Sequence, residues 1–299
     1  MNLASLTATD LPAVWALLGE VNRTPRLTPA WLAHCTLGDP TASPDLGLLA
    51  WEDGELVGLC LACLRAGVGV IKLFAVRECC RRRGLATALF DELESRLRAR
   101  GATEVTVKAV APNYIAPGVD ITYTDAVCFL LNRGYKTDRN ALVDMTVDLI
   151  HADLDTCAAE QALAGEGIVL RRAELREIPA VAAFAAAEFS VGWQQEVAEA
   201  QNYHPVPLFV ALRNDEVLGF AVIDVTGPAR FGPTGARKDL RGRGIGGALL
   251  RMSLRDLRER GESSADIGWV GPLAFYARTV GAQITRAYWR FDKTLAASL

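Results

Sequence analysis

Hydrophobic and polar positions along the 299-residue chain follow two periods, and the resulting order of elements occurs twice. Short apolar runs and alternation at every second position predict strands, whereas apolar residues three or four apart predict amphipathic helices. The first half is predicted to contain, in order, strand 2–7, helices 10–21 and 29–37, strands 46–52, 55–65 and 68–76, helix 85–100, strand 104–110, helix 125–132 and strand 135–149. The second half repeats this order with strand 168–172, helices 178–189 and 193–202, strands 208–212, 217–225 and 229–236, helix 245–260, strand 265–270, helix 273–279 and strand 283–292.

Turn residues also fall at corresponding places in the two halves. Asp53-Gly54 lies between two apolar runs, which is a strong β-hairpin signal, and Asn214-Asp215 takes that place in the second half. The segment 151–166 is short and polar and is rich in Ala and Gly, as is typical of a linker. We therefore interpret the chain as a tandem duplication of one mixed α/β unit, with an N-terminal domain over 1–150, a linker over 151–166 and a C-terminal domain over 167–299.

Each half carries a basic, glycine-containing segment between an apolar strand and a helix. The first copy is Arg81-Arg82-Arg83-Gly84-Leu85-Ala86, and the second is Arg241-Gly242-Arg243-Gly244-Ile245-Gly246. The unpaired N–H groups of a first helical turn point outward at the positive end of the helix dipole. Glycine lets an anion approach the main chain because it has no Cβ. The sequence therefore predicts a site for a phosphate-bearing cofactor in one or both halves.

Overall charge argues against some classes of partner. The chain has 32 Lys and Arg against 35 Asp and Glu, with a formal net charge of −3. We therefore do not expect bulk electrostatic binding to nucleic acid or to an anionic membrane. No apolar run approaches the roughly 18–20 residues of a membrane span, and the N-terminus lacks a signal-peptide layout, so a cytoplasmic location is expected.

The seven cysteines all lie in the first 157 residues. Cys60 and Cys63 belong to an apolar strand-like run, in which residues three apart point to opposite faces. Cys79 and Cys80 are adjacent, which is awkward for two ligands of one tetrahedral ion. We expect reduced thiols and no metal, with zinc and structural disulfides as the less favoured alternatives.

The basic turn and the β-α-α-β-β-β-α-β-α-β order together resemble the GNAT acetyltransferase superfamily. The resemblance covers nearly the whole chain, twice, and implies two tandem α/β domains, each with a mostly antiparallel mixed sheet, flanking helices and a splayed strand pair at the cofactor site. In that superfamily the turn binds the pyrophosphate of acetyl-CoA, and the preceding strand pairs with its pantetheine arm. The cofactor-binding residues that the resemblance implies are Thr234, Gly235, Ala236, Arg237, Arg241, Gly242, Arg243, Gly244, Ile245, Gly246 and Gly247 in the second half, and Arg81, Arg82, Arg83, Gly84, Leu85 and Ala86 in the first.

A second motif distinguishes the two halves. The segment from Phe275 to Gly281 resembles the aromatic helix of the superfamily, in which a Tyr at the position of Tyr276 protonates the leaving thiolate of CoA. A phenol of pKa about 10 keeps its proton at neutral pH and can act as a general acid. The alternative for Tyr276 is an aromatic side chain that only packs against the helix's neighbours.

Phe129 takes the matching place in the first half, five residues before Gly134, and it has no proton to give. The resemblance thus implies a catalytic C-terminal domain and a degenerate N-terminal domain, in which Tyr123 or Tyr135 could substitute as the acid. The division is similar to that of tandem members such as mycothiol synthase.

The remaining catalytic groups are less defined. Residues 229–236 contain no carboxylate, so Asp224, Asp266 or His204 acting through a water are the candidate bases, none of them favoured. Trp269 is interpreted either as core or as a wall of the substrate site. Residues 111–120 form a long loop where the second half has only Gly271-Pro272, and such loops are often functional.

Two further readings remain beside the GNAT resemblance. Gly242, Gly244 and Gly247 also satisfy the dinucleotide fingerprint, but charged residues separate them from the preceding strand, so an NAD enzyme is disfavoured. We expect an N-acetyltransferase that moves an acetyl group from acetyl-CoA to a primary amine by direct attack. A non-catalytic acyl-CoA sensor or interaction protein is the alternative. The acceptor (small amine, amino sugar, antibiotic, peptide N-terminus or protein lysine) and the choice between monomer and homodimer stay open.

Overall fold

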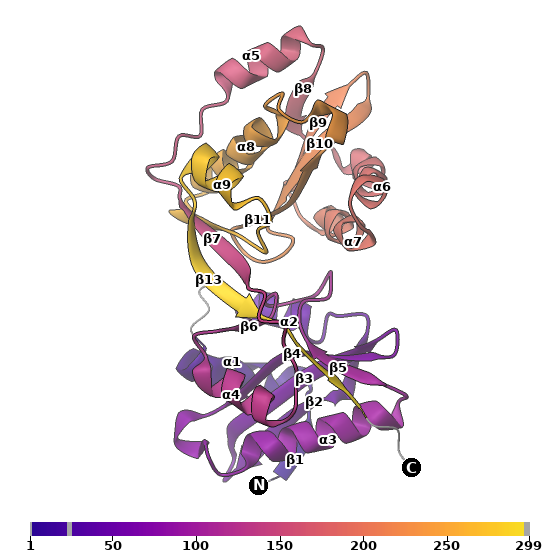
Figure 1. Cartoon of the computed structure of the whole chain (residues 1–299), viewed down its shortest axis with the longest axis vertical. Coiled ribbons are helices and arrows are strands. Elements are labelled where there is room, and N and C mark those ends of the chain that lie inside the picture. The colour runs from indigo at the N-terminus through magenta and orange to yellow at the C-terminus, as the bar shows by residue number, and fades with distance from the viewer. Residues whose placement is uncertain (1, 23–25, 296–299) are drawn as a thin grey trace. The chain divides into compact units, whose positions relative to one another are not determined.

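The computed structural model describes residues 2–22 and 26–295, and the chain forms two compact units (Figure 1). The first unit consists of Met1–Leu142 with Tyr288–Leu299, and the second is Val143–Ala287. Parts of the expected domains 1–150 and 167–299, namely residues 1, 23–25 and 296–299, lie outside the described residues.

The sheet of the first unit has the strand order β1-β2-β3-β4-β5-β14. Its strands are β1 (Asn2–Ser5), β2 (Ala42–Glu52), β3 (Glu55–Arg65), β4 (Val68–Val76), β5 (Glu104–Val107) and β14 (Phe291–Thr294). Among the described residues of this sheet, β4 and β5 are the parallel neighbours and the other pairs are antiparallel. The expected hairpin at Asp53-Gly54 joins β2 to β3. A two-residue strand, β6 (Val119–Asp120), pairs with Tyr288 and Trp289.

Helices cover both faces of this sheet because each face presents apolar side chains. The helices are α1 (Leu11–Val21), α2 (Pro29–Cys35), α3 (Leu85–Ala99) and α4 (Thr124–Asn132). Leu89, Leu93 and Leu97 of α3 pack in one core cluster, whereas Leu17 of α1 and Leu32 of α2 pack in another. Both clusters bury these leucines almost completely, which fixes β4 between the two layers.

The second sheet has the strand order β6-β13-β7-β12-β11-β10-β9-β8, and the strands from β7 to β13 lie wholly or mostly in the second unit. Its strands are β7 (Leu142–Asp148), β8 (Val169–Arg172), β9 (Leu208–Arg213), β10 (Glu216–Ile223), β11 (Arg230–Ala236), β12 (Ser264–Ile267) and β13 (Gln283–Trp289). Its helices are α5 (Cys157–Gly165), α6 (Ile178–Glu188), α7 (Val191–Glu199), α8 (Ile245–Glu259) and α9 (Leu273–Val280). Short 3-10 helices occur at η1 (Ala8–Asp10), η2 (Glu78–Cys80), η3 (Leu175–Glu177), η4 (Ala200–Asn202) and η5 (Lys238–Leu240).

Each unit contains a strand that the sequence placed in the other domain. β7, expected in the N-terminal domain, pairs antiparallel with β12 of the second unit, where Ala265 faces Val147. β14, expected in the C-terminal domain, pairs antiparallel with β5 of the first unit, where Phe291 faces Val107. The expected division into 1–150 and 167–299 therefore does not coincide with the compact units.

The expected strands 104–110 and 265–270 end early, at Val107 and Ile267, and three other expected elements differ more from those observed. The expected linker 151–166 contains α5, because Leu163 is buried in the core of the second unit and holds the segment there. The expected strand 135–149 begins as β7 only at Leu142. The expected strand 283–292 is divided between β13 and β14.

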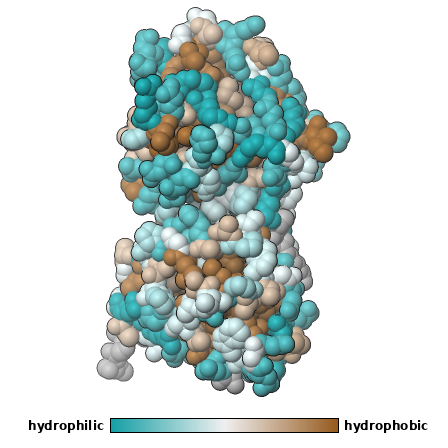
Figure 2. All heavy atoms as spheres, turned by 180° about the vertical axis from the view of Figure 1, so that it is seen from behind, coloured by the Kyte–Doolittle hydropathy of each residue, from teal (hydrophilic) through white to brown (hydrophobic). Residues whose placement is uncertain are grey.

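The described part of the chain has no helix that is long and apolar enough to cross a bilayer. Hydrophilic and hydrophobic residues are interspersed on the face drawn in Figure 2.

Candidate active site

Two parallel strands of the second unit separate after a short common stretch. β11 and β12 pair at Arg230–Asp266 and Phe231–Ile267, and β12 ends there. β11 also bulges against β10, because Thr234 faces Ala221 and Phe231 faces Ile223. Beyond the bulge, Thr234 to Ala236 still pair with β10 on one edge of β11. The other edge, which faces β12 earlier in the strand, pairs with no strand there in the described part of the chain. Its main-chain groups are therefore available to an extended ligand.

The first unit opens at the corresponding place. β4 and β5 pair only from Val68–Glu104 to Val70–Thr106. On its other edge β4 is bulged against β3, because Ile71 faces Ala62 while Leu73 faces Leu61, which leaves Lys72 as the extra residue. The duplication thus repeats both the splayed pair and its bulge.

The basic turn follows the same backbone path in both units. After η5, Gly242 and Gly244 adopt left-handed conformations with φ of 83° and 85°, and α8 begins at Ile245. After η2, Arg82 and Gly84 do the same with φ of 62° and 83°, and α3 begins at Leu85. Within the described residues no side chain caps either helix.

These turns leave room for an anion. A Cβ built on Gly84, Gly242 or Gly244 would meet no atom within 4 Å. The glycine positions are thus open, and the uncapped N–H groups of the first helical turn attract negative charge together with the helix dipole. This arrangement fits the pyrophosphate that the sequence predicted.

The arginines of the two turns differ in how they are engaged. Arg82 and Arg241 are exposed and form no ion pair with the described residues. The others have partners: Arg81 donates to the Val76 carbonyl at 3.2 Å, Arg83 pairs with Glu52 at 3.3 Å, Arg243 pairs with Glu166 at 2.5 Å, and Arg237 pairs with Glu216 and Asp239. Arg82 and Arg241 are thus the side chains free to meet an added anion.

Several expected cofactor residues have structural roles as well. The side chains of Leu85 and Ile245 are buried in the cores, so only their main chains can face a ligand. A Cβ on Gly235 would lie 2.3 Å from the ring of Phe189, so packing alone requires glycine there. Gly246 and Gly247 lie against Phe275 and Thr279 of α9, each with an ideal Cβ 3.7 Å away. Ala86 follows Leu85 in the first turn of α3.

Tyr276 lies on α9 beside the point where β11 and β12 part. Its ring packs edge-to-face against Phe231, the last residue of β11 that pairs with β12, with ring centroids 6.2 Å apart, and against Phe275 with ring centroids 5.0 Å apart. The residue is 6% exposed, and no described residue hydrogen-bonds its hydroxyl. Burial raises the pKa of Tyr276 to about 12. The second unit therefore holds a protonated phenol with an unused donor at the splay.

The first unit has no equivalent donor. Phe129 packs edge-to-face on Phe90 at 5.0 Å. Tyr135, one of the expected substitutes, is 2% exposed and donates its hydroxyl to Glu94 at 3.1 Å, so it belongs to the core. Burial raises the pKa of Tyr135 far above its ordinary value. Tyr123, the second expected substitute, donates its hydroxyl to the side-chain oxygen of Asn22 at 3.3 Å.

The expected general bases are not gathered into one site. Asp224 accepts the N–H of Ala229 at 2.8 Å and pairs with Arg260 at 2.7 Å, which holds the turn before β11. Asp266 accepts the hydroxyl of Thr146 at 2.9 Å. His204 is exposed in the segment before β9.

One cluster near the splay was missed from the sequence. Asp144 of β7 is buried, pairs with Arg230 and accepts the main-chain N–H of Trp269 at 2.8 Å. Trp269 follows the end of β12, is 43% exposed and has a φ of 50°, which is rare for a bulky residue. No local pattern marks Asp144, because its place depends on which sheet β7 joins. Trp269 is therefore no core residue, and its role as a substrate wall stays a prediction.

A model of the acetyltransferase (GNAT) family matches residues 14–118 and 174–281, one region in each half. The chain belongs to the GNAT acetyltransferase family. The expected fold, two mixed α/β GNAT domains in tandem, is thereby confirmed. No curated protein matches the sequence. Within the described residues no group of three or more His, Cys, Asp or Glu side chains is placed to hold a metal ion.

Solved structures of GNAT proteins share the fold across the whole chain. A tandem GNAT protein from the clavulanic acid biosynthesis pathway is 16% identical with a TM-score of 0.72, and the match covers 99% of each chain. A GCN5-related N-acetyltransferase from Sphaerobacter thermophilus is 18% identical with a TM-score of 0.73, covering 98% of this chain and 95% of that one. The glucosamine N-acetyltransferase region of a fungal multi-domain GH3 β-N-acetylglucosaminidase is 20% identical with a TM-score of 0.79; this match covers 98% of this chain but only 38% of that protein.

Proposed function

We propose that the protein is an N-acetyltransferase whose second unit moves an acetyl group from acetyl-CoA to a primary amine. The observation that carries the proposal is Tyr276, a buried phenol with an unused hydroxyl at the splay of β11 and β12. The uncapped N-terminus of α8 and the open glycines of the turn before it support the binding of a diphosphate at this turn. Acetyl-CoA supplies the thioester from which the acyl group is taken.

In this proposal each part of the site has one task. The N–H groups at the start of α8, with Gly242 and Gly244, bind the pyrophosphate, and Arg241 adds positive charge. The free edge of β11 from Thr234 to Ala236 pairs with the pantetheine arm and orients the thioester. When the amine attacks the thioester carbonyl directly, the C–N bond forms and the C–S bond breaks, and the hydroxyl of Tyr276 gives its proton to the departing sulfur. The nitrogen loses its extra proton to water, and the phenol is reprotonated from water.

We assign the first unit a non-catalytic part. Its turn from Arg81 to Ala86 keeps the geometry of an anion site, but Phe129 stands where a proton donor is needed. We also propose that the protein works in the cytoplasm, because its seven cysteines are all free and thiols persist in a reducing compartment.

The test is release of CoA from acetyl-CoA with a panel of primary amines. Tyr276→Phe should lower kcat by about 10²–10⁴-fold, because it removes the donated proton, while leaving the affinity for CoA by calorimetry unchanged. Tyr203→Phe is the matched control, since Tyr203 makes its hydrogen bond to the Asp224 carbonyl and should keep kcat within about threefold of the wild type.

Two results would contradict the proposal. Equal turnover by wild type and Tyr276→Phe would show that Tyr276 only packs. No turnover with any amine, in a protein that binds CoA, would favour the acyl-CoA sensor instead.

A further inference from the structure

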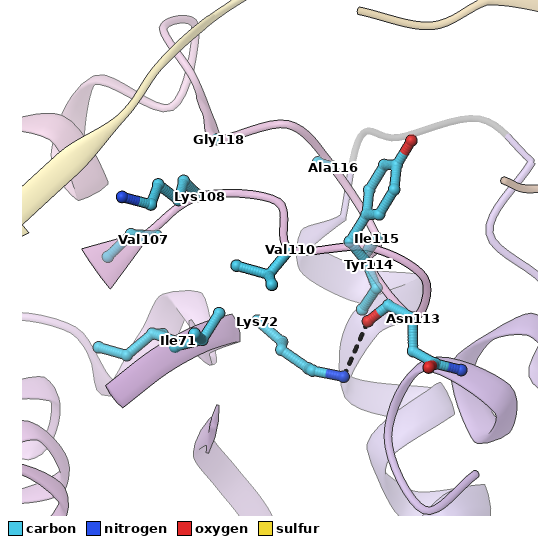
Figure 3. Close-up of a pocket in the computed structure, with 11 residues that line it drawn as sticks. Ile71, Lys72, Val107, Lys108, Val110, Asn113, Tyr114, Ile115, Ala116 and Gly118 are labelled. Carbon is cyan, nitrogen blue, oxygen red and sulfur yellow. Dashed lines mark hydrogen bonds between the residues drawn. The ribbon is translucent and has the colours of Figure 1, made fainter. Parts of the chain in front are cut away.

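Lys72 occupies a special place in the first unit. It is the bulged residue of β4, and it lies two residues beyond Val70, the last residue of β4 that pairs with β5. A small pocket lies at this opening between the two strands and the segment 108–118 (Figure 3). Ile71 and Lys72 line it from β4, and Val107 from β5.

Three oxygen acceptors surround the ammonium group of Lys72. Its Nζ donates to the Cys35 carbonyl at 2.7 Å, to the Asn113 carbonyl at 2.8 Å and to the carboxylate of Asp39. Figure 3 shows the bond to Asn113 crossing from β4 to the loop. The Lys72 side chain is 5% exposed and that of Asp39 is fully buried. Three acceptors thus meet the three N–H donors of one primary ammonium.

The acceptors are held by groups other than Lys72. Asp39 accepts the main-chain N–H and the hydroxyl of Thr41, both at 2.7 Å, and pairs with Arg65 at 2.6 Å. Arg65 also donates to the carbonyls of Val110 and Ala111, which ties down the loop that carries Asn113. Burial opposes ionisation of Asp39, but the hydrogen bonds from Lys72 and Thr41 outweigh it and lower its pKa to about 2. The three oxygens therefore form a built site.

At the position of Lys72, the bulge of the second unit carries no cationic side chain; Arg230, earlier on β11, is paired with Asp144. The bulge of β11 contains Gly232 and Pro233, neither of which can reach across the opening. The unit that carries Lys72 at its bulge is thus the one with Phe129, and the unit without this lysine is the one with Tyr276.

We infer that the first unit retains a binding site for a primary ammonium, formed by Asp39 and the carbonyls of Cys35 and Asn113, and that Lys72 fills it as an internal occupant. We interpret it as the acceptor site of a disabled first unit, and this interpretation alone rests on the proposed acyl transfer. The charged Lys72 has no lone pair for attack on a thioester, so it stays unmodified in the presence of acetyl-CoA.

Removal of the occupant tests the site. Lys72→Ala should lower the midpoint of thermal unfolding by at least about 4 °C, because Asp39 loses a buried partner. Ethylammonium chloride at about 0.2 M should then raise the midpoint of the variant by about 2–5 °C, since a ligand that binds only the folded state stabilises it. Tetramethylammonium chloride at the same concentration has no N–H group and serves as the control. The wild type should show no such difference between the two salts.

The double variant Asp39→Asn/Lys72→Ala removes the carboxylate and should lose the response to ethylammonium. Equal effects of the two salts on Lys72→Ala, or a response that survives in the double variant, would overturn the inference. Neither measurement depends on acyl transfer, so CoA release in parallel reports separately on the proposed function.

A measurement on the wild type keeps the test decisive if Lys72→Ala does not fold. Brief treatment of the native protein with acetic anhydride, followed by peptide mass spectrometry, compares Lys72 with Lys238, which is exposed in η5. Lys72 should be modified at least about tenfold more slowly and should gain no acetyl group from acetyl-CoA, because an ion-paired, buried ammonium is a poor nucleophile. Modification at the rate of Lys238 would refute the occupied site.

Discussion

Two buried tyrosines show that a proton donor needs more than a phenol. Tyr135 is as deeply buried as Tyr276, but its hydroxyl is already bonded to Glu94, which also pairs with Arg133 and Lys293. Tyr276 packs in an apolar core cluster, where its ring contacts are with Phe231 and Phe275. A ligand at the splay of the second unit can therefore accept from Tyr276 without breaking an existing bond, whereas Tyr135 would first have to break its hydrogen bond to the buried carboxylate of Glu94.

The raised pKa of Tyr276 makes a prediction for the pH dependence of turnover. Because burial raises this pKa to about 12, the phenol keeps its proton throughout the usual working range and loses it only as the pH approaches that value. For an acceptor amine of low pKa, kcat should therefore show no decline between about pH 9 and pH 11. A pH–rate profile checks this. A decline centred near pH 10 in the wild type and absent from Tyr276→Phe would mean that the phenol titrates as if exposed.

At the scale of elements, the turn before α8 combines backbone shape with charge. Gly244 has a left-handed φ and precedes the uncapped N–H groups, so a substitution there acts on both. Gly244→Asp places a negative charge where the diphosphate is proposed to bind. Gly244→Asn has nearly the same size and also tolerates the left-handed region, which makes it the matched neutral control.

Gly244→Asp should raise the KM for acetyl-CoA at least about tenfold relative to Gly244→Asn, because the carboxylate repels the diphosphate. Steady-state kinetics with saturating amine measure both values. Gly84→Asp makes the same change in the first unit and should leave this KM unaltered. Similar KM values for Gly244→Asp and Gly244→Asn would contradict an anion site at this turn.

The elements around the turns were predictable because their patterns are local. Helices 85–100 and 245–260 were expected and appear as α3 (Leu85–Ala99) and α8 (Ile245–Glu259). The ammonium site was not predictable, since Lys72 reads as one polar residue in a strand and its partner Asp39 is distant in the sequence. The expected linker was misread because helix α5 depends on burial of Leu163, which is a tertiary effect.

At the scale of the molecule, the placement of β7 and β14 shows where sequence patterns stop being informative. The alternation in Leu142–Asp148 is that of a strand, but it is compatible with either sheet. Only the pairing of β7 with β12, and of β14 with β5, decides the compact units. This is also why Asp144 could not be connected with Arg230 and Trp269 from the sequence alone.

The compact units predict how fragments of the chain behave. Residues 143–287 contain strands β8 to β12 whole and most of β7 and β13, so this fragment should unfold cooperatively on heating. Residues 1–150 lack β14 and the fully buried Phe291, so this fragment should melt at a lower temperature or without a cooperative transition. Circular dichroism of both fragments measures this. A cooperative transition of 1–150 at the midpoint of the full chain would show that β14 contributes little.

The position of β14 also sets the order in which the molecule can be completed during translation. The ribosome makes Phe291 after all of Val143–Ala287, so the second core can close while the first still lacks an edge strand. The domain that begins synthesis first is then the one that matures last. A premature stop near residue 288 would remove β14 and so damage the N-terminal domain, but it would spare the second unit, Val143–Ala287, which is translated before the stop.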